Sequence, residues 1–197
     1  MTSGHTKLTN KLKKLSGAHP DISDVILFGS AARGKEKPND IDILVLFKDK
    51  VDKNLEYMIR KEAEKEYSNV SVVSKTEKTV MEESFDAREG ILFEGKSLIT
   101  GEPLARKHGF RSFGMFKYRF GNWSSLQKTK FYHALNGRGG KIGIIALLEC
   151  IKLSDSVVLA PLEKTEQFRE FLDSWKITYI YVPTLMPERL GKKKILE

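Results

Sequence analysis

The chain has 197 residues, 40% of them hydrophobic, which is enough to bury a core in one large or two small domains. Its formal net charge is +8, from 34 Lys and Arg against 26 Asp and Glu. The single cysteine, Cys150, excludes an intrachain disulfide and is typical of a reducing compartment, so we expect a cytoplasmic protein. The apolar runs are too short to cross a bilayer and the first residues are polar, so we expect neither a membrane span nor a signal peptide.

The first hundred residues alternate between helical and strand-like patterns. Apolar residues that recur at three- and four-residue steps indicate helices, and short apolar runs indicate strands. The elements expected in chain order are a helix around Leu8, Leu12 and Leu15, strands at 25–28 and 41–47, a helix at 51–67, a strand at 69–74, a helix around Val80, Met81 and Phe85, and short strands at 91–93 and 97–99. This alternation predicts an α/β (α+β) domain with a small mixed sheet and flanking helices.

Two carboxylates stand at the start of the second predicted strand. Asp40 and Asp42 are separated by one residue, so in a strand both project to one face, while Ile41 faces the other way. Two carboxylates placed together beside apolar residues are unfavourable without a counter-charge. Because Mg²⁺ and Mn²⁺ prefer carboxylate and phosphate oxygens, we expect Asp40 and Asp42 to hold a divalent metal ion.

The first strand leads directly into a small polar turn. Gly29 and Ser30 follow Phe28, and a glycine there allows a phosphate to approach the backbone. If the turn opens a short helix, its free N–H groups would bind the anion. A metal ion beside such a phosphate cradle indicates transfer of a phosphoryl or nucleotidyl group. The structural alternative is a plain Gly-Ser turn beside a solvated pair of carboxylates.

This stretch resembles the nucleotidyltransferase superfamily that includes DNA polymerase beta, and most closely its minimal nucleotidyltransferase members. The family pattern is an apolar residue, Gly-Ser, a short loop and Asp-apolar-Asp-apolar, which Phe28-Gly29-Ser30 and Asp40-Ile41-Asp42-Ile43 match. Arg33-Gly34 also fits the usual loop. The resemblance covers roughly residues 5–100. It implies a nucleoside triphosphate as substrate, with Gly29 and Ser30 holding the β- and γ-phosphates, Arg33 supporting them, and Asp40 and Asp42 as catalytic metal ligands.

One position departs from the family pattern. The family usually carries a third carboxylate on a later strand, which often acts as general base on the acceptor hydroxyl. In the predicted strand at 69–74, Ser71 occupies that position. Three interpretations stay open: another residue substitutes for the acid, the acceptor needs no base, or the domain binds nucleotide without turnover.

The positive charge belongs to the second half of the chain. Residues 1–105 hold 17 Lys and Arg against 18 Asp and Glu, whereas residues 106–197 hold 17 against 8. No acidic residue occurs between Pro103 and Leu148, and aromatic residues interleave with the cations. This composition favours contact with RNA or DNA. The possible contacts are Arg111, Lys117, Arg119, Lys128, Lys130, Arg138 and Lys141.

The aromatic residues of this half have a structural interpretation as well. In the run from Phe116 to Phe120 they alternate with Lys117 and Arg119, so a strand would bury the rings and leave the cations in solvent. A helix is expected from Ser124, its candidate cap, to Leu135, followed by the glycine-rich segment 136–141, which is either a helix stop or a phosphate grip. Further strands are expected at 157–160 and 177–182, with an amphipathic helix around Phe168 and Leu172 between them.

The sequence therefore predicts a nucleotidyltransferase-like domain at 1–102 and a compact basic α+β domain of unrecognised family at 103–197. The expected activity is Mg²⁺-dependent transfer of a nucleoside monophosphate to an unknown acceptor, either nucleic acid or protein. The alternative is a weak or inactive domain of the same fold that binds nucleic acid or, as the family resemblance implies, acts as the antitoxin-like partner of another protein.

Overall fold

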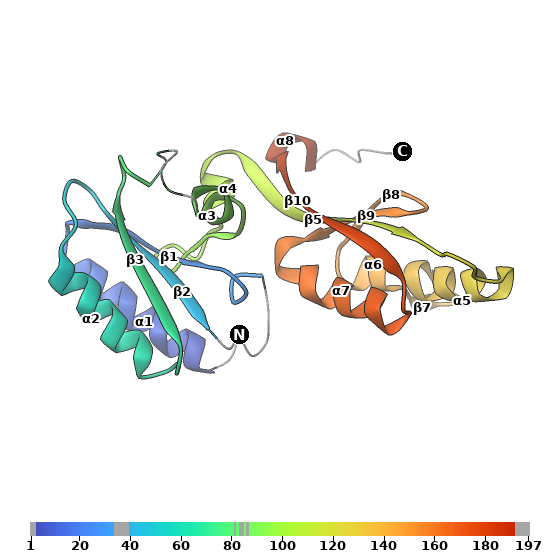
Figure 1. Cartoon of the computed structure of the whole chain (residues 1–197), viewed down its shortest axis with the longest axis horizontal. Helices are drawn as coiled ribbons and strands as arrows, with labels where there is room; N and C mark the ends of the chain where they lie inside the picture. Colours follow the sequence, from blue (N-terminus) through green and yellow to red (C-terminus); the bar gives the residue numbers. More distant parts are fainter. Residues whose placement is uncertain (1–2, 34–39, 81, 83–84, 86, 192–197) are drawn as a thin grey trace. The chain divides into compact units, whose positions relative to one another are not determined.

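The computed structural model of the chain describes residues 3–33, 40–80, 82, 85 and 87–191. The chain divides into two compact units, Met1–Gly109 and Phe110–Glu197, each with its own sheet (Figure 1). None of the helices in the described ranges has the length and apolar character that a membrane crossing requires.

The first unit is built on a four-stranded mixed sheet in the order β3-β2-β1-β4. The two central strands, β1 and β2, are antiparallel, β3 joins β2 in parallel, and β4 joins β1 antiparallel. The strands span Ile22–Phe28 (β1), Ile41–Phe47 (β2), Val70–Thr76 (β3) and Lys96–Ser97 (β4). The predicted mixed sheet and the strands around 25–28, 41–47 and 69–74 are confirmed.

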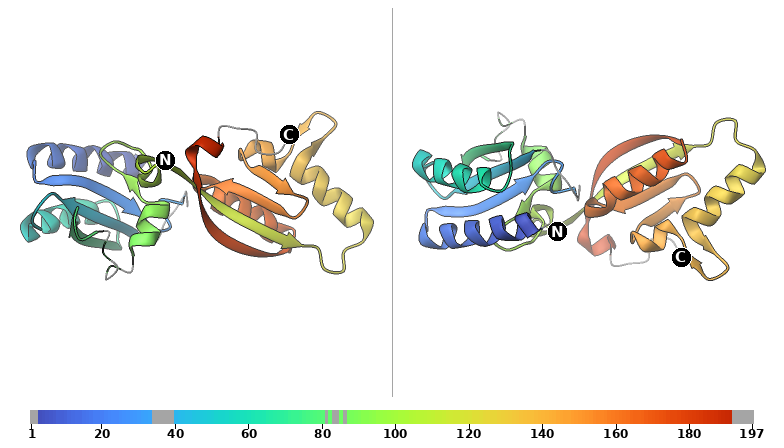
Figure 2. Two further views of the ribbon diagram at one scale, coloured as in Figure 1. Left: turned by 90° about the horizontal axis from the view of Figure 1, so that it is seen from above. Right: turned by 90° about the horizontal axis from the view of Figure 1, so that it is seen from below.

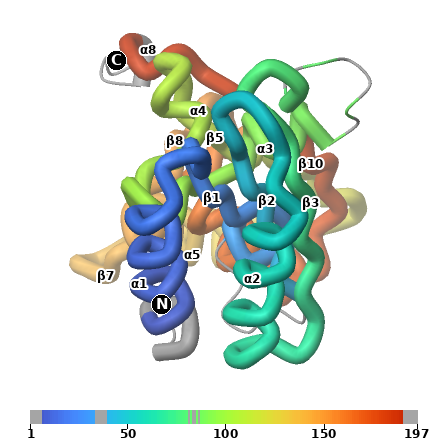
Figure 3. Tube along the Cα trace, turned by 90° about the vertical axis from the view of Figure 1, so that its left-hand side faces the viewer, coloured from blue at the N-terminus to red at the C-terminus, as the bar shows by residue number. Residues whose placement is uncertain are grey.

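Helices cover both faces of this sheet. The long helices α1 (Ser3–Ala18) and α2 (Lys53–Glu64) lie side by side on one face, as Figures 1 and 3 show. The short helices α3 (Arg88–Glu94) and α4 (Leu104–Lys107) lie on the other (Figure 1). The Asp52 side chain caps α2, because it accepts hydrogen bonds from the backbone N–H groups of residues 54 and 55.

Strand alternation decides which side chains of β2 face which helices. Ile41, Ile43 and Val45 are fully buried in the core beneath α1 and α2. Leu44 points the other way, into a smaller core with Ile91 of α3. Because side chains two residues apart share a face, Asp42 lies on the side of the sheet that α3 covers.

Part of the segment between β3 and β4 differs from the sequence prediction. Residues 91–93, expected to form a strand, belong to helix α3, because a short apolar run does not distinguish a strand from a buried helical turn. The helix ends at Gly95, where an added Cβ would lie 2.3 Å from the carbonyl oxygen of Ile91. The expected helix around Val80 is absent from the described residues, since Val80 lies in a turn and Phe85 in no helix, and Met81 lies outside the described residues. The strand expected at 97–99 shortens to β4.

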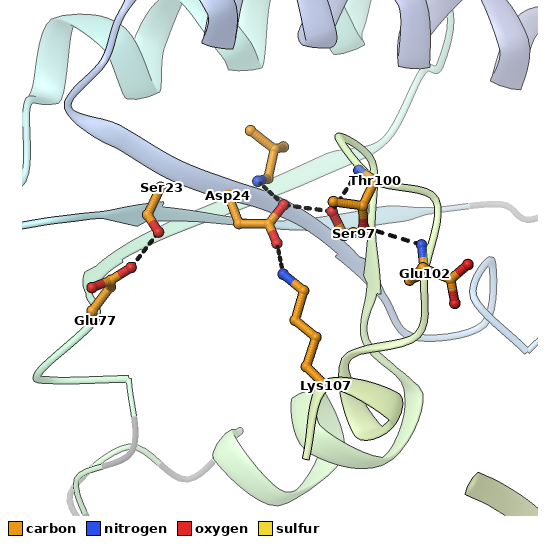
Figure 4. A network of polar contacts seen from close by, with 8 residues as sticks. Ser23, Asp24, Glu77, Ser97, Thr100, Glu102 and Lys107 are labelled. Atoms are coloured by element: carbon orange, nitrogen blue, oxygen red, sulfur yellow. Dashed lines mark hydrogen bonds and ion pairs between the residues drawn. The ribbon is translucent and has the colours of Figure 1, made fainter. Parts of the chain in front are cut away.

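A buried carboxylate ties the end of the first unit to its sheet. Asp24 of β1 is 3% exposed and accepts hydrogen bonds from the Ser97 hydroxyl at 2.7 Å and from Lys107 Nζ of α4 at 2.6 Å (Figure 4). Helix α4 therefore belongs to the first unit. The compact units divide after Gly109, beyond the boundary expected between residues 102 and 103.

The second unit is a four-stranded antiparallel sheet in the order β10-β5-β9-β8. Its main elements follow the order β-α-β-β-α-β, the ferredoxin-like arrangement, with a small hairpin, β6-β7, after the first helix. Its elements span Phe110–Arg119 (β5), Ser125–Asn136 (α5), Gly137–Arg138 (β6), Lys141–Ile142 (β7), Ile144–Leu147 (α6), Ile151–Ser154 (β8), Val157–Pro161 (β9), Leu162–Lys164 (a 3-10 helix), Thr165–Ser174 (α7), Thr178–Pro187 (β10) and Glu188–Gly191 (α8). Figure 2 shows this unit from two further sides.

Aromatic side chains form the core of the second unit. Phe116 and Tyr118 of β5 are buried, whereas Lys117 and Arg119 between and beyond them are exposed. The Phe116 ring meets Phe168 of α7 edge to face, with ring centroids 5.1 Å apart. The structure thus confirms that these aromatics are core residues. It also confirms the helix expected after Ser124, whose hydroxyl caps α5.

Candidate active site

The candidate site lies where β1 ends beside the start of β2. Phe28, the last residue of β1, pairs with Asp42. The next residue, Gly29, has a φ of +77°, and an added Cβ would lie 2.4 Å from Asp42 Oδ2. Both observations require glycine at this position. The positive φ is a conformation that other residues rarely adopt, and the Asp42 carboxylate occupies the space that a Cβ would need. The Gly29 backbone is therefore in direct contact with the Asp42 carboxylate.

The residues after Gly29 turn back toward the second carboxylate. The backbone N–H groups of Ala32 and Arg33 donate to the Gly29 carbonyl, which makes residues 29–33 a turn rather than the helix expected there, and Gly34 lies outside the described residues. The Ser30 hydroxyl donates to Asp40 Oδ1 at 3.5 Å, the long limit of a hydrogen bond. Four of the five predicted site residues, Gly29, Ser30, Asp40 and Asp42, thus lie together.

The electrostatic environment of Asp42 is unfavourable for its charged form. Burial raises the pKa of the Asp42 carboxyl above its ordinary value, and the negative charges of Asp40 and Glu94 raise it further. The Arg33 guanidinium opposes these effects. A bound cation would offset the repulsion between these carboxylates, so the excess of negative charge fits a divalent metal ion.

Glu94 is a site residue that sequence reasoning missed. It is the last residue of α3, and its Oε2 accepts a charge-assisted hydrogen bond from Arg33 Nη1 at 2.6 Å. The pair is partly buried, with 13% of the Glu94 side chain and 30% of the Arg33 side chain exposed. The ion pair with Glu94 therefore keeps the guanidinium of Arg33, the fifth predicted site residue, close enough to act on Asp42. No local pattern around Glu94 signals this, because its proximity to Asp42 depends on how α3 packs on the sheet.

The position expected to hold a third carboxylate lies next to Asp42. Ser71 of β3 pairs directly with Asp42 across the parallel β2-β3 ladder, and its side chain is exposed. In the described ranges no cluster of three or more His, Cys, Asp and Glu side chains is placed to hold a metal ion. The residues present fit an Mg²⁺ or Mn²⁺ ion held by two carboxylates, with phosphate oxygens of a bound nucleotide completing its ligands.

The predicted nucleic-acid contacts of the second unit do not share one surface. Lys117 and Arg119 lie on the face of the sheet opposite the buried Tyr118, against which α5 packs through Phe131. The seven positions distribute over three elements: Arg111, Lys117 and Arg119 on β5, Lys128 and Lys130 on α5, and Arg138 and Lys141 on the β6-β7 hairpin.

Comparisons with known proteins bear on the first unit. Residues 10–97 match the family model described as "Polymerase beta, Nucleotidyltransferase". Curated protein sequences give no significant match. A solved structure described as a toxin-antitoxin with AMP-PNP is 27% identical over 46% of this chain and 71% of its own, with a TM-score of 0.36. A tri-AMPylated Shewanella oneidensis HEPN toxin in complex with MNT antitoxin is 22% identical over 48% and 71%, with a TM-score of 0.33.

Proposed function

Since residues 10–97 are a nucleotidyltransferase domain of the polymerase beta family, we propose that the chain transfers a nucleoside monophosphate from an NTP to an acceptor and releases pyrophosphate. The observation that supports this most is the contact between the Gly29 backbone and Asp42, which places the turn after β1 directly beside a carboxyl whose pKa is raised by burial and by the charges of Asp40 and Glu94. An anionic substrate that arrives with a divalent cation fits both features.

Each site residue has a distinct task in this proposal. Asp40 and Asp42 would hold the Mg²⁺ or Mn²⁺ ion through their carboxylates, and the Ser30 hydroxyl, which donates to Asp40, would orient that carboxylate. The backbone N–H groups at Gly29 and Ser30 receive the β- and γ-phosphates. When bound, the metal ion would neutralise phosphate charge and stabilise the attacking and leaving oxygens.

Arg33 and Glu94 act on the charge balance of the site. Arg33 is the cation of the site, and it lowers the pKa of the Asp42 carboxyl. Its ion pair with Glu94 fixes the guanidinium at the edge of the site. In our proposal Glu94 is a positioning residue, which holds Arg33 ready for the phosphates of the substrate.

Binding of nucleotide without turnover is the second candidate function. Ser71 favours it, because its hydroxyl stands where a general base for the acceptor would be expected and does not accept a proton at neutral pH. The chain would then act through a partner, nucleic acid or protein, that the second unit holds.

A transfer assay separates the two candidates. The protein is incubated with each of the four α-³²P-labelled NTPs, with Mg²⁺ or Mn²⁺, and with RNA, DNA and protein acceptors. Transfer of label that is lost in both Asp40→Asn and Asp42→Asn supports the enzyme. Metal-dependent NTP binding without transfer to any acceptor supports the binding protein, and absence of NTP binding contradicts both.

A further inference from the structure

The β6-β7 hairpin is a small exposed element that contributes little to the core. Gly139 and Gly140 connect its strands, and both have positive φ values, 59° and 79°, as a two-residue hairpin turn requires. The turn residues and both flanking cations are exposed, and Ile142 is 77% exposed. Because the hairpin buries so little apolar surface, it adds little to the stability of the second unit, and stability does not account for its presence.

The base of this hairpin is held closely against the end of α5. An added Cβ at Gly137 would lie 2.4 Å from the carbonyl oxygen of Lys141, and one at Gly143 would lie 2.5 Å from the carbonyl oxygen of Leu135. Neither position has room for a side chain. The capping box formed by Ser124 and Gln127 fixes the opposite end of the same helix. The base of the hairpin is therefore packed closely against the C-terminal end of α5.

Two cations stand directly opposite each other on the hairpin. Arg138 and Lys141 are cross-strand partners, so their Cβ atoms are about 5 Å apart, and like charges in this position destabilise a ladder. Arg138 Nη1 lies 3.2 Å from a ring nitrogen of His133, which supplies no negative charge. Within the described ranges, neither Arg138 nor Lys141 has a carboxylate at ion-pair distance, in contrast to Lys107 and Lys152. The hairpin thus concentrates positive charge that the protein does not neutralise.

We propose that this hairpin, together with Lys130, binds the sugar-phosphate backbone of a nucleic acid. Lys130 is exposed and precedes His133 by three positions, so it lies on the same side of α5, one turn away. A row of cations fits a polyanion with a charge at each nucleotide, and the bare backbone of Gly139 and Gly140 admits a phosphate closely. The nearby rings of Phe131 and Tyr118 are buried and cannot stack on bases. Contacts to the sugar-phosphate backbone carry no base identity, so we expect binding that is independent of sequence.

Fluorescence anisotropy tests this proposal with labelled single- and double-stranded RNA and DNA, in a salt series without NTP or metal. The test variant is Arg138→Gln/Lys141→Gln. The matched control is Lys164→Gln/Lys176→Asn, which removes two positive charges at the ends of α7, and Asn at position 176 tolerates the positive φ there. Because the assay contains neither NTP nor metal ion, its result does not depend on whether the candidate site in the first unit binds NTP.

The proposal predicts that the wild type binds with an affinity that falls steeply with salt. The test variant should bind roughly tenfold more weakly, and its log-log salt slope should be shallower by about 1.5, while the control stays close to the wild type. Binding of RNA, DNA or both with this pattern supports the proposal. A flat salt response, an equal loss in the control variant, or binding to polyglutamate or to phosphatidylserine vesicles but not to nucleic acid would overturn it.

Discussion

Ser71 stands directly opposite Asp42 in the parallel ladder between β3 and β2. Directly opposed residues in a ladder point to the same face of the sheet, so the hydroxyl lies beside the carboxylate on the side that α3 covers. On the other edge of β2, Phe28 pairs with the same Asp42 and leads into Gly29. The candidate site therefore combines the turn at residues 29–33 and two carboxylates with a hydroxyl where a third acid is expected.

Restoring a carboxylate at position 71 should strengthen the site. In Ser71→Asp the new side chain would face the metal position beside Asp42, and we expect metal-dependent NTP affinity, or turnover, to rise by about tenfold. The variant Ser71→Asn has the same size without the charge and should leave both near the wild-type value. Isothermal titration with NTP and Mn²⁺ measures the effect, and a loss of affinity in the Asp variant would show that position 71 does not face the metal.

A side chain at Gly29 should disrupt the site more than it disrupts the fold. The methyl group of Gly29→Ala would overlap Asp42 Oδ2 at 2.4 Å and force the carboxylate aside, so nucleotide binding should fall at least tenfold. The strained φ should also lower the free energy of unfolding by about 1–2 kcal/mol. Gly101→Ala is the matched control, because Gly101 has a φ of +80° and open space around it. It should lose similar stability and keep nucleotide binding.

The charges around Asp42 predict that Glu94→Gln and Arg33→Gln shift the pKa of its carboxyl in opposite directions. Glu94→Gln removes a negative charge that raises the pKa of the Asp42 carboxyl, so that pKa should fall. Arg33→Gln removes the positive charge that opposes it, so the pKa of Asp42 should rise further. Carbon-13 NMR titration of the metal-free protein reads both values. Shifts in the same direction for the two variants would contradict the described arrangement of charges.

Cys150 is half-buried, and its thiol should react slowly while the protein is folded. Burial raises the pKa of its thiol from 9.0 to about 12, so the thiolate fraction at pH 8 should be lower than in the unfolded chain by more than about a hundredfold. Reaction with Ellman's reagent should be slow until denaturant is added.

The same thiol should make stability depend on pH. Because the unfolded thiol loses its proton first, the unfolded state binds fewer protons between pH 9 and 12, and the free energy of unfolding should fall as pH rises through that range. Cys150→Ser should reduce this fall.

Much of the site's backbone could be predicted from the sequence, because it depends on local patterns. The short apolar runs predict β1 and β2. The i, i+2 spacing of Asp40 and Asp42 brings the two carboxylates together. The cap at Ser124 likewise predicts where α5 begins. What these residues bind stays a prediction.

Tertiary packing decided what the sequence did not predict. Glu94 reaches Arg33 only because α3 packs on Ile26 and Leu44, and the short run at 91–93 carries no period that distinguishes helix from strand. The two units divide after Gly109 and not after residue 102, so α4 belongs to the first unit. There Lys107 of α4 pairs with Asp24, which is far away in the sequence.

Calorimetric titration of NTP with Mn²⁺ into Asp42→Asn and Asp24→Asn tests the central claim most directly. Both substitutions neutralise one carboxylate on the same face of the same sheet. Asp42→Asn should abolish metal-dependent NTP binding without loss of thermal stability, because it removes a charge that its surroundings disfavour. Asp24→Asn should keep the binding and lose about 1–3 kcal/mol of stability, because Lys107 and Ser97 lose a charged partner. Unchanged NTP binding in Asp42→Asn would contradict the proposed nucleotide site.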